Sequence, residues 1–167
     1  WLVRADGVLV GMTYERSHEV VGWHRHLIGG TDAKVESVAV IPNTTGSRDD
    51  LWAVIQRTVN GVSVRYIEFM THGMPEVSVN TIAATYLDSM LTYEGGGVTS
   101  VFGLEHLEGQ TVSVLADGAA HPDRVVSSGS ITLNGSYNVV HAGLPYTSTL
   151  QTMRIEAGAE DGTAQGK

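Results

Sequence analysis

The chain has 167 residues, of which 42% are hydrophobic and 17% are charged, and its formal net charge is −8. It is long enough to bury a core, and its acidic balance argues against a basic surface for nucleic-acid phosphates. The absence of cysteine excludes disulfides, thiolate metal sites and cysteine nucleophiles. No apolar run approaches the roughly 18–20 residues of a membrane-spanning helix.

The first 28 residues predict three strands. Asp6-Gly7 separates WLVRA from VLVGMTYE, and we expect the same two-residue turn here as at Asn60-Gly61. The next strand is VVGWHRHLI, closed by Gly29-Gly30. Alternation puts Trp23 on one face of this strand, together with Val21, Arg25 and Leu27, and it puts His24 and His26 on the other face with Val20. We expect the Trp23 face to be core and the histidine face to be solvated.

The clearest hairpin is LWAVIQRTVNGVSVRYIEF, residues 51–69, which follows the strand KVESVAVI and a polar loop, residues 44–50. Asn-Gly suits a type I′ turn because both central residues need a positive φ. A two-residue turn fixes the register, with Val59 facing Val62, Arg57 facing Val64 and Ile55 facing Tyr66. We expect the base of this hairpin, which carries Trp52 and Phe69, to be buried on both faces.

The region up to residue 75 therefore predicts about six antiparallel strands without a helical period. Its two hairpins are alike, because each has an aromatic-led strand, a DG or NG turn and a strand with tyrosine. Such a pair indicates a meander, either as propeller-like blades or as one antiparallel sheet.

Residues 76–97 are expected to connect two modules. A helical turn is compatible with residues 81–91, but alternation favours a strand from about Tyr86. The run Gly95-Gly96-Gly97 is typical of a hinge or a domain boundary.

Residues 98–157 predict a second all-β module, a small antiparallel barrel or sandwich. Its expected turns are Asp117-Gly118, Ser128-Gly129 and Asn134-Gly135. A break at residues 143–146 precedes a last strand, residues 150–156, and residues 158–167 are expected to be a polar tail. The chain begins WLV without an initiator Met and ends in a Gly-rich stretch. We therefore expect a piece of a longer protein, a hypothesis that the intact mass of the native product tests.

His24 and His26 are the best candidates for metal ligands, because residues i and i+2 of a strand share a face. Zinc binding would need a third ligand, such as Glu15 or Glu19. The sequence has no H-E-x-x-H motif, so we favour a solvated strand face.

Other candidate chemistry has less support. Four acids are candidates for a glycosidase-type carboxylate pair, namely Asp49, Asp50, Glu15 and Glu19, but such a pair needs a cleft and acids in loops are usually just solvated. Three serines lack the G-x-S-x-G context of a nucleophile, namely Ser37, Ser89 and Ser148. Two further histidines beside turns are interpreted as structural or exposed, namely His106 and His121. We assign no catalytic or cofactor-binding residue, and we expect no cofactor.

Three stretches of the chain resemble the tail nozzle proteins of short-tailed bacteriophages and prophages, a family also called tail tubular protein B. They are WLVRADGVLVGMTYERSHEVVGWHRH with VESVAVIP and LWAVIQRTVNGVSVRYIE; LDSMLTYEGG; and VFGLEHLEGQTVSVLADGAAHPDRVVSSGSITL with VVHAGLPYTSTLQT. Together they cover most of the chain, and the most specific string is G-L-x-H-L-E-G-x-x-V-x-V-L-A-D-G.

The resemblance implies a non-enzymatic structural component of the virion tail, made in the bacterial cytoplasm. Copies would form a ring below the portal and its adaptor and contact the neighbouring tail proteins. DNA would pass through the ring without specific binding, and an acidic lumen would suit this because it repels phosphates. Full-length members of the family are several times longer than this chain.

Two alternatives remain open. One is a carbohydrate- or receptor-binding β-module of a phage tail, with Trp1, Trp23 and Tyr146 as stacking platforms for sugar rings. The other is a metal-dependent hydrolase that uses His24 and His26 with nearby acids.

Overall fold

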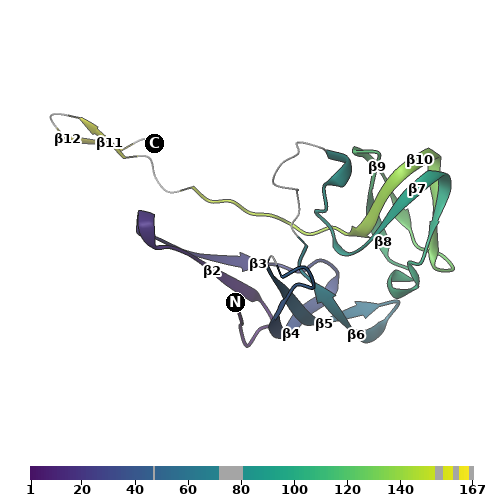
Figure 1. Ribbon diagram of the computed structural model, residues 1–167, viewed down its shortest axis with the longest axis horizontal. Helices are drawn as coiled ribbons and strands as arrows, with labels where there is room; N and C mark the ends of the chain where they lie inside the picture. The colour runs from purple at the N-terminus through teal and green to yellow at the C-terminus, as the bar shows by residue number, and fades with distance from the viewer. Residues whose placement is uncertain (47, 72–80, 153–155, 160–161, 166–167) are drawn as a thin grey trace.

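The computed structural model describes residues 1–46, 48–71, 81–152, 156–159 and 162–165. The described chain is all-β and antiparallel, as predicted (Figure 1). Its strands form two three-stranded sheets, one four-stranded sheet and one two-stranded sheet. No helix in the described ranges has the length and apolar character that crossing a bilayer requires.

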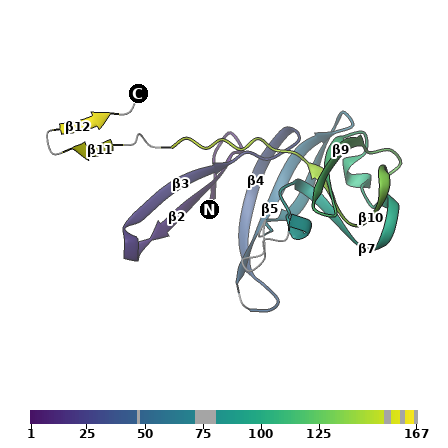
Figure 2. The same cartoon turned by 90° about the horizontal axis from the view of Figure 1, so that it is seen from above.

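The first sheet is a hairpin extended by one short strand. Its strands, in spatial order, are β1 (Leu2–Val3), β2 (Leu9–Glu15) and β3 (Val20–His26). A 3₁₀ helix, η1 (Arg16–His18), closes the far end of the hairpin. β1 pairs only with Leu9 and Val10, so the outer part of the β2–β3 hairpin is a two-stranded ribbon that projects from the other sheets (Figure 2).

The prediction of a two-residue turn at Asp6-Gly7 was wrong. The Arg4 amide donates to the Val8 carbonyl over 3.0 Å, which leaves a three-residue loop, and only Gly7 in it has a positive φ, +86°. The Asp6 side chain accepts from the Arg4 guanidinium and from the Val8 amide. These bonds favour the three-residue hairpin loop with glycine in the left-handed position.

The second sheet contains the Asn-Gly hairpin. Its strands, in order, are β4 (Thr31–Pro42), β5 (Asp49–Val59) and β6 (Val62–Phe69). Asn60 and Gly61 have φ values of 49° and 76°, as a type I′ turn requires. The predicted register is confirmed, since Val59 faces Val62, Arg57 faces Val64 and Ile55 faces Tyr66.

These six strands therefore form two sheets, with a small core between them. The fully covered apolar side chains are Leu9, Val35, Leu51 and Ile55. The Val35 amide also donates to the Gly7 carbonyl over 2.9 Å, which fixes β4 beside the β1–β2 loop.

The third sheet carries the larger core. Its strands, in spatial order, are β7 (Asp88–Phe102), β10 (Ser130–Leu144), β8 (Thr111–Ala116) and β9 (Ala119–Val125). β7 and β9 lie at its edges, so the described sheet is open and not a closed barrel. Its side chains bury a cluster of Val, Leu and Ile that includes Leu104, Leu107 and Val140. The predicted turns at Asp117-Gly118 and Ser128-Gly129 are confirmed, with positive φ at all four residues.

Two expected breaks lie inside strands. Asn134-Gly135 belongs to β10 and does not form a turn, because β10 pairs with β7 on both sides of it. The register shifts between the pairs Thr132–Ser100 and Tyr137–Val98. The extra residues on β10 form a bulge there. The glycines 95–97 belong to β7 and continue the strand instead of forming a hinge.

The segments between and after these sheets are short. A 3₁₀ helix, η2 (Thr81–Ala83), takes the place of the helical turn considered from sequence, and the strand expected from Tyr86 begins at Asp88. Residues 76–80 of the expected connector lie outside the described residues. Another 3₁₀ helix, η3 (Glu105–Leu107), follows β7.

The expected last strand at 150–156 does not form at 150–152, and 153–155 lie outside the described residues. A two-stranded hairpin, β11 (Glu156–Ala159) with β12 (Gly162–Gln165), occupies most of the expected polar tail.

Candidate interaction surface

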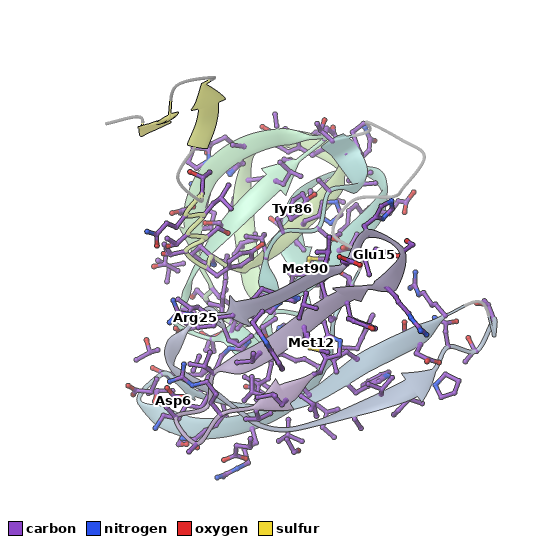
Figure 3. All side chains as sticks on the ribbon, turned by 90° about the vertical axis from the view of Figure 1, so that its left-hand side faces the viewer. Asp6, Met12, Glu15, Arg25, Tyr86 and Met90 are labelled. Atoms are coloured by element: carbon purple, nitrogen blue, oxygen red, sulfur yellow. The ribbon has the colours of Figure 1, made fainter. Side chains whose placement is uncertain are left out.

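Cross-strand pairing defines the two faces of the β2–β3 hairpin. Met12 faces Trp23 and Tyr14 faces Val21, so these four side chains share one face. Arg25, paired with Val10, lies on the same face nearer the root. Met12 and Arg25 mark this hairpin in Figure 3, and Glu15 marks its far end.

This apolar face of the hairpin is exposed. The exposed fractions are 47% for Met12, 60% for Tyr14, 59% for Val21 and 63% for Trp23. The expectation that Trp23 lies in the core was therefore wrong. Alternation separates the two faces of a strand but does not say which face is covered. Contiguous exposed apolar side chains of this kind mark interaction sites.

The opposite face carries the two histidines, which are partly buried. His24 Nδ1 and His26 Nε2 are hydrogen-bonded over 2.7 Å, and the indole of Trp1 packs on both rings, 5.6 Å and 5.1 Å between centroids. Gly11 makes room, since a Cβ there would lie 2.2 Å from His24 Cε1. Burial, and then the charge of His24, lower the pKa of His26. This is a packed aromatic cluster, so the expected solvated face was also wrong.

Within the part of the chain that the structure describes, no Asp or Glu completes a three-ligand metal group with His24 and His26. Glu15 faces Val20 across the hairpin, about 13 Å along the strand from His24 at roughly 3.3 Å per residue. The Glu15 carboxylate accepts from the Ser17 hydroxyl and amide, which lowers its pKa. Among the described residues no three His, Cys, Asp or Glu side chains are placed to share a metal ion. Glu19, the other acid considered as a third ligand, follows η1 and has a left-handed backbone with a φ of 54°.

The other candidate residues are dispersed over the fold. Asp50, at the start of β5, accepts from Asn43 over 2.9 Å and pairs with Arg48 over 3.1 Å. The neighbouring Asp49 faces Pro42. The three serines lie on separate segments, Ser37 in β4, Ser89 in β7 and Ser148 after β10.

His106 and His121 make hydrogen bonds to the backbone. His106 Nε2 contacts the Ser89 carbonyl over 2.9 Å, and its own carbonyl accepts from the Tyr66 hydroxyl. His121 Nε2 accepts from the Asn134 amide over 3.0 Å. These contacts agree with the structural interpretation of the two residues.

A second apolar face lies on the outer side of the β4–β6 sheet. Pairing puts Trp52, Phe69, Val54 and Ile67 on it, and Ile41 lies there beside Asp50. Ile41, Ile67 and Phe69 are 48%, 73% and 50% exposed. The expected burial of the hairpin base on both faces was therefore wrong. A surface hollow on this face is lined by apolar and polar side chains, namely Ile41, Pro42, Trp52 and Phe69 with Asn43, Thr44, Arg48 and Asp50.

Sequence reasoning missed the charged group that joins the sheets. Arg57 is fully buried, and its guanidinium forms a two-bond ion pair with Glu68 and donates through Nε to the Gly29 carbonyl over 2.8 Å. The Gly29 amide donates to Asp88 Oδ2 over 2.5 Å. Burial raises the pKa of Asp88, although the Gly29 bond and Arg57 oppose this shift. Only the alternation of Arg57 with Ile55 and Val59 signalled an inward side chain.

The structure thus presents two exposed apolar faces on two different sheets. At neither face do the described residues bring together three His, Cys, Asp or Glu side chains that could hold a metal ion. A scan against protein-family models and a search of curated proteins found no match to this sequence.

Proposed function

We propose that this chain is part of a structural protein of a phage tail tube, which acts by self-association and by contact with neighbouring tail and portal-side proteins. Its sequence resembles the tail nozzle proteins over most of its length. In this role the chain positions other protein copies and does not carry out a reaction. The site of action is the virion tail.

The observation that carries this proposal is the exposed apolar face of the β2–β3 hairpin. A monomer gains nothing from exposing Met12, Tyr14, Val21 and Trp23 together, whereas an interface buries such side chains at its centre. Tyr and Trp are also the residue types that dominate binding energy in interfaces. The edge strand β3 leaves backbone groups free to pair with another chain.

In this proposal the net negative charge of the chain lets DNA pass through the ring without being retained. The chain has 18 acidic and 10 basic residues, so phosphates are repelled on balance. Retention of duplex DNA by the assembled protein at physiological salt would contradict this part of the proposal.

The experiment that tests the proposal is negative-stain imaging of the full-length protein with and without its portal-side partners. Closed rings, formed alone or on the partner, are the expected result. A protein that stays monomeric in both conditions would overturn the proposal.

Carbohydrate binding is a second candidate, which the exposure of Trp23 favours. Trp23 and Tyr14 share a face and offer ring surfaces on which a sugar could stack. Trp1 suits this role less, because its indole already packs on two histidines, and Tyr146 lies after the end of β10. A glycan array separates the candidates, since specific binding lost in Trp23→Ala supports the carbohydrate function.

A further inference from the structure

We propose that the joint between the β4–β6 sheet and the four-stranded sheet is a proton-sensitive latch, which closes when the carboxyl group of Asp88 takes up a proton and loosens when that proton is lost. The joint consists of Gly29, Arg57, Glu68 and Asp88. The inference concerns a conformational change within one chain, so it goes beyond the proposed function and does not depend on ring formation.

The joint lies where two sheets meet the link between β3 and β4. The carbonyl of Gly29, in that link, accepts from Arg57 Nε of β5 over 2.8 Å. The amide of the same residue donates to Oδ2 of Asp88, the first residue of β7, over 2.5 Å. One peptide segment therefore connects a side chain of the β4–β6 sheet to a side chain of the four-stranded sheet.

Two adjacent glycines allow the joint to close tightly. A Cβ at Gly29 would lie 2.5 Å from the Pro145 carbonyl oxygen. A Cβ at Gly30 would lie 2.9 Å from Arg57 Cδ and 3.1 Å from Leu144 Cδ1. The backbone of the link thus fits between the buried arginine on one side and the end of β10 on the other.

The joint holds two carboxyl groups and one guanidinium. Arg57 is fully buried and directs both terminal nitrogens to Glu68. Asp88 forms no ion pair within the described residues, and its carboxyl accepts only from the Gly29 amide there. His106 of η3 contacts the carbonyl of the residue after Asp88 and not the carboxyl. One negative charge in the joint is therefore unbalanced until Asp88 takes up a proton, and a buried unbalanced charge is costly.

Closure of the joint and proton uptake are linked. Burial raises the pKa of Asp88 and the charge of Glu68 adds to this shift, whereas the Gly29 amide and the Arg57 guanidinium oppose it. Opening exposes the carboxyl to water and returns its pKa to the ordinary value. The closed joint is therefore most stable in acid, and it loses this stability as pH rises from the ordinary carboxyl pKa through the raised one.

Both hydrophobic cores lie outside the joint. One core contains Leu9, Val35 and Ile55, the other contains Val126 and Val140, and neither includes a residue of the joint. A polar contact between two separate apolar cores can open at a lower free energy than the whole fold. Opening of the latch therefore changes how the two sheets lie against each other and leaves each core intact.

Native-state hydrogen exchange of the full-length protein tests the latch across the acidic to neutral range. The amide of Gly29 reports the joint. Two buried residues report the cores, namely Val35, whose amide donates to the Gly7 carbonyl, and Val126, whose amide donates to the Gln110 carbonyl. Protection factors, taken relative to an unstructured chain at the same pH, remove the direct effect of pH on the exchange chemistry.

We expect the protection factor of Gly29 to fall as pH rises, by about tenfold for each unit by which closure raises the pKa of Asp88. It should also lie well below the values of Val35 and Val126 at every pH. A low concentration of denaturant should lower the two core values and leave that of Gly29 unchanged, because opening of the joint exposes little surface.

Three variants identify the group that titrates. Asp88→Asn keeps an acceptor for Gly29 and should remove the pH dependence of its protection. Asp123→Asn is the matched control, because Asp123 is exposed on β9 and accepts from the Ser113 hydroxyl, and it should keep the wild-type profile. Glu68→Gln should move the fall in protection to lower pH, since the charge of Glu68 helps to raise the pKa of Asp88. Circular dichroism checks that each variant is folded.

The outcomes decide the inference without reference to assembly. Equal protection of Gly29 in acid and at neutral pH would overturn the latch, and so would the same pH profile in wild type and Asp88→Asn. If denaturant lowers the protection of Gly29 as it does that of Val35 and Val126, the joint opens only with the whole fold and the inference fails. Ring formation is measured separately, so none of these results bears on the proposed function.

Discussion

Asp88 accepts the amide hydrogen of Gly29 through Oδ2 over 2.5 Å, which ties the first strand of the four-stranded sheet to the link between β3 and β4. The Gly29 carbonyl accepts from Arg57 at the same point. The link between β3 and β4 is thus hydrogen-bonded at Gly29 to side chains from two different sheets. A side chain at Gly29 would collide with the Pro145 carbonyl, 2.5 Å from the added Cβ.

The Asp88 carboxyl should make stability depend on pH. Burial raises its pKa, so the folded protein holds this proton more tightly than the unfolded chain does. Its contribution to the free energy of unfolding therefore falls as pH rises from the ordinary carboxyl pKa through the raised one. Asp88→Asn keeps an acceptor for Gly29 without a titrating group.

Denaturant unfolding of wild type and Asp88→Asn across the acidic to neutral range measures this effect. The stability of the variant relative to the wild type should increase as pH rises. Parallel pH profiles of the two proteins would contradict the role assigned to Asp88.

Replacing Arg57 with methionine should destabilise the fold by about 3–5 kcal/mol, because it leaves Glu68 and the Gly29 carbonyl without their partner. Arg65→Met is the matched control. Arg65 also forms a two-bond pair, with Glu36, but that pair is exposed and should matter little. Urea unfolding measures both, and equal losses would show that burial of Arg57 is not the cause.

Replacing Gly61 with alanine should cost roughly 1–2 kcal/mol, because φ is +76° there and L-residues disfavour this conformation. An added Cβ meets no atom within 4 Å, so the cost comes from the backbone alone. Gly22→Ala is the control, since its site is equally open and its φ is not positive. Thermal unfolding should show a loss for Gly61→Ala only.

The pKa of His26 should rise towards its ordinary value in His24→Gln and stay below it, because burial is the larger cause of the lowering and the charge of His24 the smaller. Because the pKa of His26 is lowered in the folded state, the unfolded chain binds this proton more tightly. The free energy of unfolding should therefore fall as pH falls from the ordinary histidine pKa to the lowered one. NMR titration of the imidazole protons measures the shift, and an unchanged midpoint would exclude coupling between the two rings.

Local chemistry made the turn at Asn60-Gly61 and the register of its hairpin predictable. Asn60-Gly61 fixed the pairing of β5 with β6 because both residues adopt the positive φ of a type I′ turn, which closes a two-residue loop. Asn134-Gly135 has the same letters and forms no turn, since pairing of β10 with β7 on both sides of the bulge outweighs the local preference. Turn residues permit a turn, and tertiary pairing decides whether it forms.

The candidate surface was not predictable from alternation. Trp23 and His24 belong to opposite faces in any strand, but only the packing of Trp1 and the small size of Gly11 decide that the histidines turn inward. The buried Arg57 was missed because its partners, Glu68 and Gly29, come from a different strand and a different loop. Such matches depend on contacts distant in sequence.

The most direct test of the account is mass photometry of the full-length wild-type protein beside Trp23→Asp and Val20→Asp. Val20 lies on the opposite face of the same hairpin and is 47% exposed, so Val20→Asp is the matched control. The account predicts closed, multi-copy particles for the wild type and Val20→Asp, and mainly single copies for Trp23→Asp. Single copies of the wild type with and without portal-side proteins would contradict it.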